Sequence, residues 1–364
     1  MWPAFATASA AGARARGVVE TGERAAMARL AEGFRQQYGV PGLAIAIAFR
    51  GQLRYEEAFG MADGERGERL TPAHRFRIAS VSKPITACAI MDLVERGRVK
   101  LDDRVFGRGA ILGTDYGRTP YKRYVEDVTV EHLLTHTAGG WPNDGTDPMF
   151  HQPTMSVTEL ISWTLDSIPL TSAPGVQYAY SNFGYCVLGR VIEILTGSRY
   201  EDHVRSRILS RCGISDMTIA GNGLADRLPG EVRYFGQNGE NPYTVNVRRM
   251  DSHGGWIASA RDLVSFVAHV DGLRTTPNIL RAETIARMVT ASTANPGYAK
   301  GWAVNRQNNW WHSGSLPGTE TIMVRTAGGF AWAALTNTRR GGSMGRDLDD
   351  LIWKMTAQVT NWAG

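Results

Sequence analysis

A serine and a lysine stand three residues apart at the start of an apolar segment. They are Ser80 and Lys83, within the stretch RIASVSKPITACAI. On a helix, positions i and i+3 lie on one face, so the lysine amine can reach the serine hydroxyl. An unprotonated lysine can serve as the base that makes a serine nucleophilic. Taken alone, the pair also fits an exposed lysine in the first turn of a helix.

The use of lysine in this chain favours a chemical role for Lys83. Only five of the 40 basic residues are lysine, and the other 35 are arginine. Arginine stays protonated, whereas a buried lysine can lose its proton. A lysine in an apolar setting is costly unless its amine is paired or neutral. Lys83 therefore fits a proton-transfer group better than a surface charge.

Two further short motifs carry groups that suit the same chemistry. Tyr180 and Asn182 follow a Pro-Gly turn in PGVQYAYSNFGY and precede a predicted helix. A phenol near an ammonium can have its pKa lowered and can carry protons, and an amide can fix the lysine or bind a carbonyl. In WWHSGSLPG, His312 and Gly314 lie at the end of a predicted strand, where glycine allows another backbone to come close.

Ser-Val-Ser-Lys, Tyr-Ser-Asn and His-Ser-Gly, in this order and at these separations, resemble the three signature motifs of the serine β-lactamase and penicillin-binding-protein superfamily. The similarity is closest to the branch that holds class C β-lactamases, DD-peptidases and family VIII esterases. It covers about residues 22 to 360 and includes LLTHTAGG and GGWIASARDL.

The resemblance implies a role for each motif residue. Ser80 would be the acylated nucleophile, Lys83 and Tyr180 the proton-transfer pair, and Asn182 a member of the polar network. The backbone N–H groups of Ser80 and Ser315 would form the oxyanion hole. No metal and no cofactor are implied. Which of Lys83 and Tyr180 acts as the base is left open.

The third motif departs from the usual Lys-Thr-Gly, because it begins with His312 and continues to Gly314. A fixed ammonium suits the carboxylate of a β-lactam, whereas histidine is partly neutral near pH 7. Some DD-peptidase-like and D-aminopeptidase-like relatives carry His-x-Gly. The first hypothesis is therefore a serine hydrolase of esters, or of D-amino-acid peptides or amides, acting through a Ser80 acyl-enzyme. A β-lactamase or DD-carboxypeptidase is the alternative, and a non-catalytic scaffold with the same fold is an alternative of another class.

Hydrophobic patterning predicts the elements that must position these residues. A helix is expected over about residues 22–37, then two strands joined by a turn at Arg50-Gly51, and strands return after residue 301 before a closing helix. The predicted class is α+β, with an antiparallel sheet flanked by helices and an inserted helical domain. The predicted parts are a tail at 1–21, a sheet domain from 22–99 and 256–364, and a mainly helical insertion at 100–255.

Other signals are weaker. GGSMG fits G-x-S-x-G around Ser343, but an α/β-hydrolase needs a later histidine and His312 is the last one. His132 and His136 have the spacing of zinc ligands without the H-E-x-x-H pattern, so packed or hydrogen-bonded histidines are expected. The remaining predictions concern two residue types. Buried free thiols are expected at Cys88, Cys186 and Cys212, and either a cleft lining or core positions at Trp141, Trp302, Trp310 and Trp311.

Composition limits the partners. The net charge is +5 with scattered basic residues, so no nucleic-acid partner is expected. No apolar run is long enough for an integral membrane segment. The expected partner is a small ester, amide or peptide, and the oligomeric state is left open. The resemblance favours a periplasmic or secreted protein, but the N-terminus lacks the basic and apolar regions of a signal peptide, so the compartment is also left open.

Overall fold

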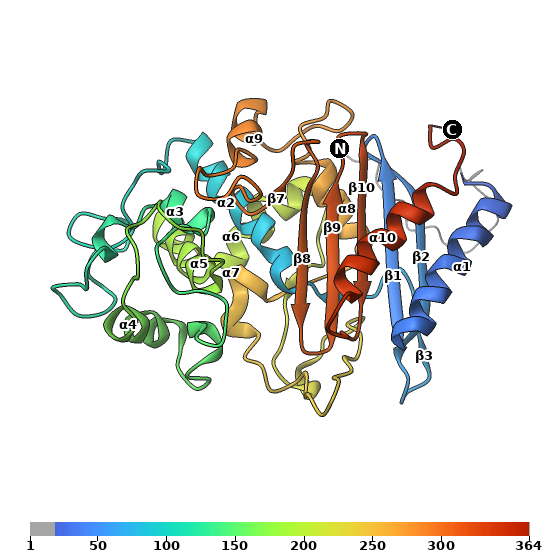
Figure 1. Ribbon diagram of the computed structural model, residues 1–364, viewed down its shortest axis with the longest axis horizontal. Helices are drawn as coiled ribbons and strands as arrows, with labels where there is room; N and C mark the ends of the chain where they lie inside the picture. Colours follow the sequence, from blue (N-terminus) through green and yellow to red (C-terminus); the bar gives the residue numbers. More distant parts are fainter. Residues whose placement is uncertain (1–18, 364) are drawn as a thin grey trace.

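A seven-stranded antiparallel sheet forms the centre of the computed structural model, which describes residues 19–363. Most of the predicted tail at 1–21 thus lies outside the described residues. The strand order is β3-β2-β1-β10-β9-β8-β7, so both ends of the chain build one sheet, as predicted (Figure 1). The strands are β1 Gly42–Phe49, β2 Gln52–Asp63, β3 Glu68–Arg69, β7 Ala303–Val304, β8 Trp310–Leu316, β9 Thr319–Arg325 and β10 Phe330–Thr336.

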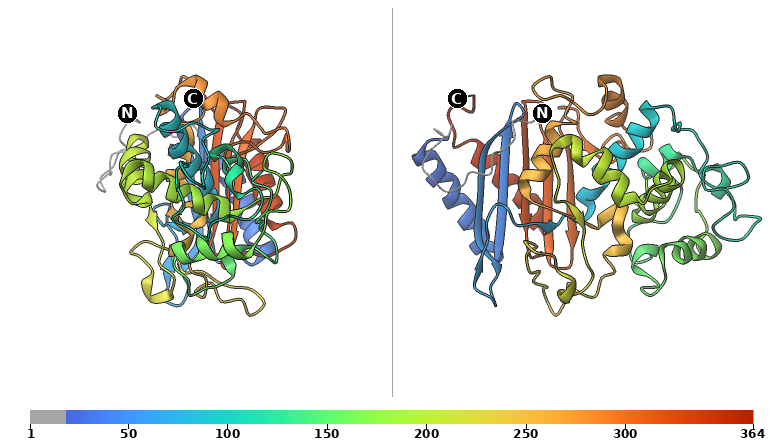
Figure 2. Two further views of the ribbon diagram at one scale, coloured as in Figure 1. Left: turned by 90° about the vertical axis from the view of Figure 1, so that its left-hand side faces the viewer. Right: turned by 180° about the vertical axis from the view of Figure 1, so that it is seen from behind.

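Helices cover both faces of this sheet. Helices α1 (Thr21–Tyr38) and α10 (Met344–Thr356) lie on one face, and α8 (Ala260–Ala268) lies on the other (Figure 2). The sequence of β1 explains how both faces are filled, because successive side chains point to opposite sides. Its leucine and isoleucines pack toward α1 and α10, and its alanines pack into the core that includes α8.

The remaining helices lie beside β8, mostly in the part of the chain predicted as a helical insertion (Figure 1). They are α2 Ser82–Glu95, α3 Val130–Leu134, α4 Val157–Ser167, α5 Asn182–Thr196, α6 Tyr200–Arg207, α7 Asp251–Gly254 and α9 Ala282–Met288, with short 3-10 turns that include η1 Ala79–Val81 and η3 Pro148–Phe150. A small second sheet holds β4 Phe76–Arg77, β5 Thr218–Ile219 and β6 Trp256–Ala258. The division into domains at residues 99/100 and 255/256 stays a prediction.

The cysteines and tryptophans belong to the interior. All three cysteines are buried and free, which confirms that prediction. Trp302 stacks on Phe266 with an interplanar angle of 4°, and Trp141 packs edge-on against Phe183. Trp310 is also buried, and Trp311 packs against the core beneath α1 and α10. Of the two interpretations, the structure therefore supports core positions for the tryptophans.

None of the helices within residues 19–363 combines the length and the apolar character that crossing a bilayer requires.

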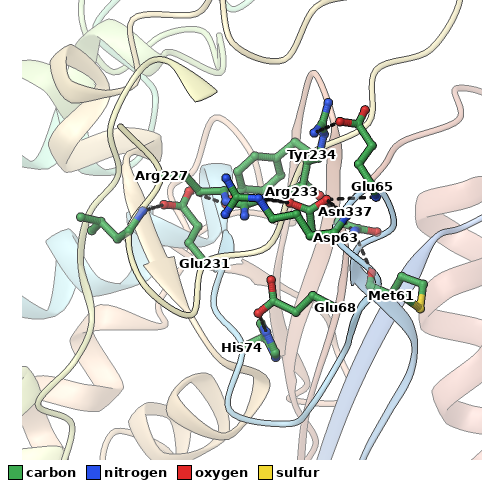
Figure 3. A network of polar contacts seen from close by, with 12 residues as sticks. Met61, Asp63, Glu65, Glu68, His74, Arg227, Glu231, Arg233, Tyr234 and Asn337 are labelled. Atoms are coloured by element: carbon green, nitrogen blue, oxygen red, sulfur yellow. Dashed lines mark hydrogen bonds and ion pairs between the residues drawn. The ribbon is translucent and has the colours of Figure 1, made fainter. Parts of the chain in front are cut away.

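A polar network fastens the loop segment 221–234 to the end of β2 (Figure 3). Arg227 forms an ion pair of 2.8 Å with Asp63, whose side chain is 1% exposed. Arg233 pairs with Glu65, and its carbonyl accepts a hydrogen bond of 3.0 Å from Asn337. The segment so held also binds Arg77, three residues before Ser80: Arg77 N–H donates to the Tyr234 hydroxyl, and its side chain donates to the carbonyl of Gly221.

Replacing Asp63 by alanine is expected to lower the free energy of unfolding by about 3–5 kcal/mol, because one partner of a buried ion pair is removed. Glu65→Ala is the matched control. The Glu65 side chain is 67% exposed, and an exposed pair is worth about 1 kcal/mol or less. Denaturant unfolding of both variants checks the prediction. Equal losses for the two variants would contradict it.

Candidate active site

Ser80 lies in η1, immediately before α2, on a backbone segment that is fastened to the sheet. Thr319 Oγ1 donates to Arg77 O at 2.9 Å, and Thr321 Oγ1 donates to Ile78 O at 3.0 Å. Ala79 has a φ of 48°, in the left-handed region that a residue with a side chain rarely adopts. A strained conformation of this kind persists only where the surrounding structure holds it. Here it helps to orient the residue that follows, Ser80.

The third motif lies directly beside this segment. Within β8, strand β7 pairs with Trp310 and Trp311, and beyond these two residues the outer edge of β8 faces η1. A Cβ on Gly314 would lie 2.2 Å from Ile78 O. Glycine is therefore required there, as the sequence predicted, and Ser315 follows it on the same strand beside η1.

Lys83 is buried at 0% exposure and donates to three oxygen atoms. Its Nζ lies 3.0 Å from Ser80 Oγ, 2.7 Å from Asn182 Oδ1 and 3.0 Å from His253 O. The amide and carbonyl oxygens only accept hydrogen bonds. A neutral amine keeps two N–H groups, so it can serve both oxygens and turn its lone pair toward the Ser80 hydroxyl.

Burial lowers the pKa of Lys83 to about 7, although the charge of Asp147 opposes this shift. Tyr180 lies with its ring centroid 4.8 Å from Lys83 Nζ and forms a side-chain hydrogen bond to Ser80. The expectation of a lowered phenol pKa is wrong: burial raises the pKa of Tyr180 well above 10. The phenol is therefore neutral near pH 7, and the amine is the group that titrates there.

His312 is buried and neutral in this site. Its Nδ1 lies 2.6 Å from Ser313 O, and since a carbonyl only accepts, Nδ1 carries the proton. Nε2 is then an acceptor and receives the hydroxyl proton of Tyr298 at 3.1 Å. Burial, assisted by the charge of Lys83, lowers the pKa of His312 to about 3. The position that usually carries an ammonium thus carries no charge.

Ser343, His132 and His136, the weaker candidates for catalytic or metal-binding residues, form structural hydrogen bonds instead. Ser343 precedes α10 and hydrogen-bonds Tyr38 and Asp347, on the face of the sheet that α1 and α10 cover. His132 Nδ1 accepts the N–H of Thr129 and so closes the first turn of α3. His136 Nδ1 accepts from Ser181 N at 3.0 Å, in the turn that contacts Tyr180.

Sequence reasoning missed four residues of the site. Asp147 accepts from Asn182 Nδ2 at 2.7 Å, the His253 carbonyl binds Lys83, and Tyr298 binds His312. Arg77 is 2% exposed and donates to the carbonyls of Gly221 and Pro242, far along the chain, so it anchors the backbone three residues before Ser80. The only feature of the sequence that points to Arg77 is its place in RIASVSK. The Asp-Pro pair at 147–148 indicates a helix cap but no role in the site.

Comparisons with known proteins identify the family and the fold. The family model described as Beta-lactamase matches residues 27–356. Penicillin-binding protein 4 of Amycolatopsis lactamdurans is 27% identical over 355 residues, which cover 90% of this chain and 88% of that protein. Esterase EstB of Burkholderia gladioli is 32% identical over 196 residues, 48% of this chain and 46% of that protein. D-amino acid amidase from Ochrobactrum anthropi SV3 superimposes with a TM-score of 0.76 at 23% identity, over 94% of this chain and 100% of that one.

The protein is a serine hydrolase with a β-lactamase-type fold. Ser80 and Lys83 lie where α2 begins, and Gly314 of β8 lies beside them. The chain belongs to the Beta-lactamase family. Both the predicted superfamily and the predicted fold are confirmed.

Proposed function

We propose that this protein hydrolyses carboxylic esters or amides through an acyl-enzyme on Ser80. Neutral Lys83 takes the proton of the Ser80 hydroxyl as Oγ attacks the carbonyl carbon of the substrate. The N–H groups of Ser80 and Ser315 bind the negative charge that grows on the carbonyl oxygen. The proton now on Lys83 reaches the leaving group through the Tyr180 hydroxyl, which gives up one proton as it takes another, so the alcohol or amine departs and both residues are neutral again. Water then attacks the acyl-enzyme and gives a proton to neutral Lys83, which returns it to Ser80 Oγ as the acid is released.

One observation carries the proposal. Two fixed acceptors, Asn182 Oδ1 and His253 O, bind two N–H groups of Lys83 and leave its third position 3.0 Å from Ser80 Oγ. Because the pKa of this buried amine falls to about 7, a large share of the molecules carries a free base at neutral pH. If Lys83 served only packing or an ion pair, its amine would not have to lie beside the partly exposed hydroxyl of Ser80.

The substrate class follows from the charge of the site. Neutral His312 offers no cation to a carboxylate beside the reacting carbonyl, so neutral esters come first and D-amino-acid amides or peptides second. The esterase and amidase names among the relatives support this order. β-Lactams come third, since they can still acylate Ser80 without a charged anchor. A cavity of about 440 Å³ lies beside Ser315, where Arg339 forms an ion pair with Glu240. Its lining consists of Gln237, Asn238, Glu240, Ser315, Glu320, Arg339 and Gly341.

Peptide-mapped mass spectrometry after treatment with a fluorophosphonate tests the proposal. The wild type is expected to carry one phosphonyl adduct on Ser80, Ser80→Ala none, and Ser343→Ala the same adduct as the wild type. A labelled Ser343, or no adduct on the folded wild type, would favour the scaffold alternative. Hydrolysis of a p-nitrophenyl ester, a D-amino-acid amide and a β-lactam then ranks the three substrate classes.

A further inference from the structure

Asp147 is a buried carboxylate that the acyl-transfer steps do not use. It is 1% exposed and precedes η3 as its capping residue. Its Oδ1 accepts from Met149 N at 2.9 Å, and its Oδ2 accepts from Asn182 Nδ2 at 2.7 Å. Among the described residues no arginine, lysine or histidine forms a direct ion pair with it. A buried charge without a direct counter-ion is costly, so its position calls for an explanation.

Asp147, Asn182 and Lys83 form a hydrogen-bond chain with one permitted direction. Protonated Lys83 only donates, and the neutral amine directs its lone pair at Ser80, so in both forms it donates to the oxygen of the Asn182 amide. The carboxylate only accepts, so it binds the amide nitrogen. An asparagine alone could present either end of its amide to Lys83. The carboxylate removes that choice, because the reversed amide would place an N–H against the lysine and an oxygen against Asp147.

We propose that Asp147 is a positioning residue that orients the Asn182 amide toward Lys83 and supplies the counter-charge of the lysine. This inference rests on the proposed function, in which Lys83 is the base for Ser80. Through the amide, the carboxylate governs both where the amine lies and at which pH it gives up its proton. It touches neither the substrate nor the reacting atoms.

The other titratable groups around Lys83 carry no charge near neutral pH. Burial raises the pKa of the phenols and lowers the pKa of the imidazoles that face it. These groups are Tyr180 and Tyr185 from the start of α5, His136 after α3, His253 in α7 and His312 in β8. Burial raises the pKa of Asp147 as well, but the Asn182 N–H, the Met149 N–H and the charge of Lys83 oppose this.

Two other charged groups lie near Asp147 and its turn. Arg249, before α7, donates to the carbonyls of Met149 and Met155 and so holds the chain around η3. Asp144 is in the same loop, but its carboxylate is satisfied by Thr146 at the surface. Neither contacts Lys83. The carboxylate of Asp147 is therefore the counter-charge available to the buried amine.

The rate at which a fluorophosphonate labels Ser80, measured from pH 5 to 9, tests the inference without knowledge of the substrate. Asp147→Asn keeps an oxygen for Asn182 and removes the charge, so the acid limb of the profile is expected to move to lower pH. The reason is that a nearby negative charge stabilises the ammonium, and its loss favours the neutral base. Asp147→Ala removes the hydrogen bond as well, and its plateau rate is expected to fall about 10- to 100-fold.

Two controls separate charge from structure. Asp144→Asn makes the same change in charge on the same loop and is expected to leave the profile unchanged. Asp147→Glu keeps the charge, so its acid limb is expected to stay at the wild-type pH even if the plateau falls. An acid limb of Asp147→Asn at or above the wild-type pH would overturn the inference, and so would a shifted limb in Asp147→Glu. Labelling of Ser80→Ala as fast as the wild type would instead overturn the proposed function itself.

Discussion

Replacing Lys83 by methionine is expected to lower kcat/KM for a p-nitrophenyl ester by about 10²–10⁴-fold, the range that a positioned general base contributes. Methionine fills the same buried space but has no lone pair that can take the proton of Ser80. Arginine is expected to be no better than methionine, because a guanidinium stays protonated. The measurement is the initial rate of ester hydrolysis by the purified variants.

The same lysine sets the pH dependence of the wild type. The amine must be neutral in the free enzyme, and its pKa is about 7. The value of kcat/KM is therefore expected to rise with pH through about 7 and to level above it. No fall from Tyr180 is expected below pH 10, because burial raises the pKa of that phenol.

Lys300→Met provides the matched control for Lys83. Lys300 is also buried, at 3% exposure, but its Nζ pairs with Glu131 and Thr290 rather than with a serine. This variant is expected to lose stability and to keep the wild-type pH profile. A Lys83→Met enzyme with more than about a tenth of the wild-type kcat/KM would remove lysine from the role of base.

Replacing Gly314 by alanine is expected to lower kcat/KM by about 10²–10³-fold, which is the effect of losing one oxyanion-hole donor. The added Cβ would lie 2.2 Å from Ile78 O and 2.6 Å from Thr321 Oγ1. Both atoms belong to the contact that holds β8 against η1. Strand β8 must therefore move outward, which separates the N–H of Ser315 from the N–H of Ser80.

Gly328→Ala, in the turn between β9 and β10, is the control. A Cβ at Gly328 would have only an ordinary contact of 3.8 Å with Thr326, so neither rate nor stability is expected to change. Gly314→Ala is also expected to lose about 1–3 kcal/mol in denaturant unfolding, the usual effect of overpacking. A Gly314→Ala enzyme that unfolds more readily but hydrolyses the ester at the wild-type rate would contradict an oxyanion hole at this place.

The sequence alone was sufficient for the features that depend on local spacing. The i, i+3 relation places Ser80 and Lys83 on one face, and hydrophobic patterning predicts strands near both ends of the chain. A close approach of another backbone at Gly314 was also expected, and the structure adds that a Cβ there would lie 2.2 Å from Ile78 O. The order of the three motifs then identified the family, and with it the fold.

The tertiary structure decided the protonation states, because desolvation depends on residues that are distant in the sequence. Lys83 has a pKa of about 7 because groups from α5, α7 and β8 bury it together. The same burial raises the pKa of Tyr180, contrary to the sequence expectation, and fixes the neutral form of His312.

Asp147 shows the limit of sequence reasoning most plainly. Its partner Asn182 is 35 positions further along the chain, and Asn182 is in turn 99 positions from Lys83. No periodic pattern links residues across loops of that length, because their approach is set by how α2, η3 and α5 pack. The reactive residues could therefore be identified from the sequence, whereas the charge that each one carries is determined by the packing around it.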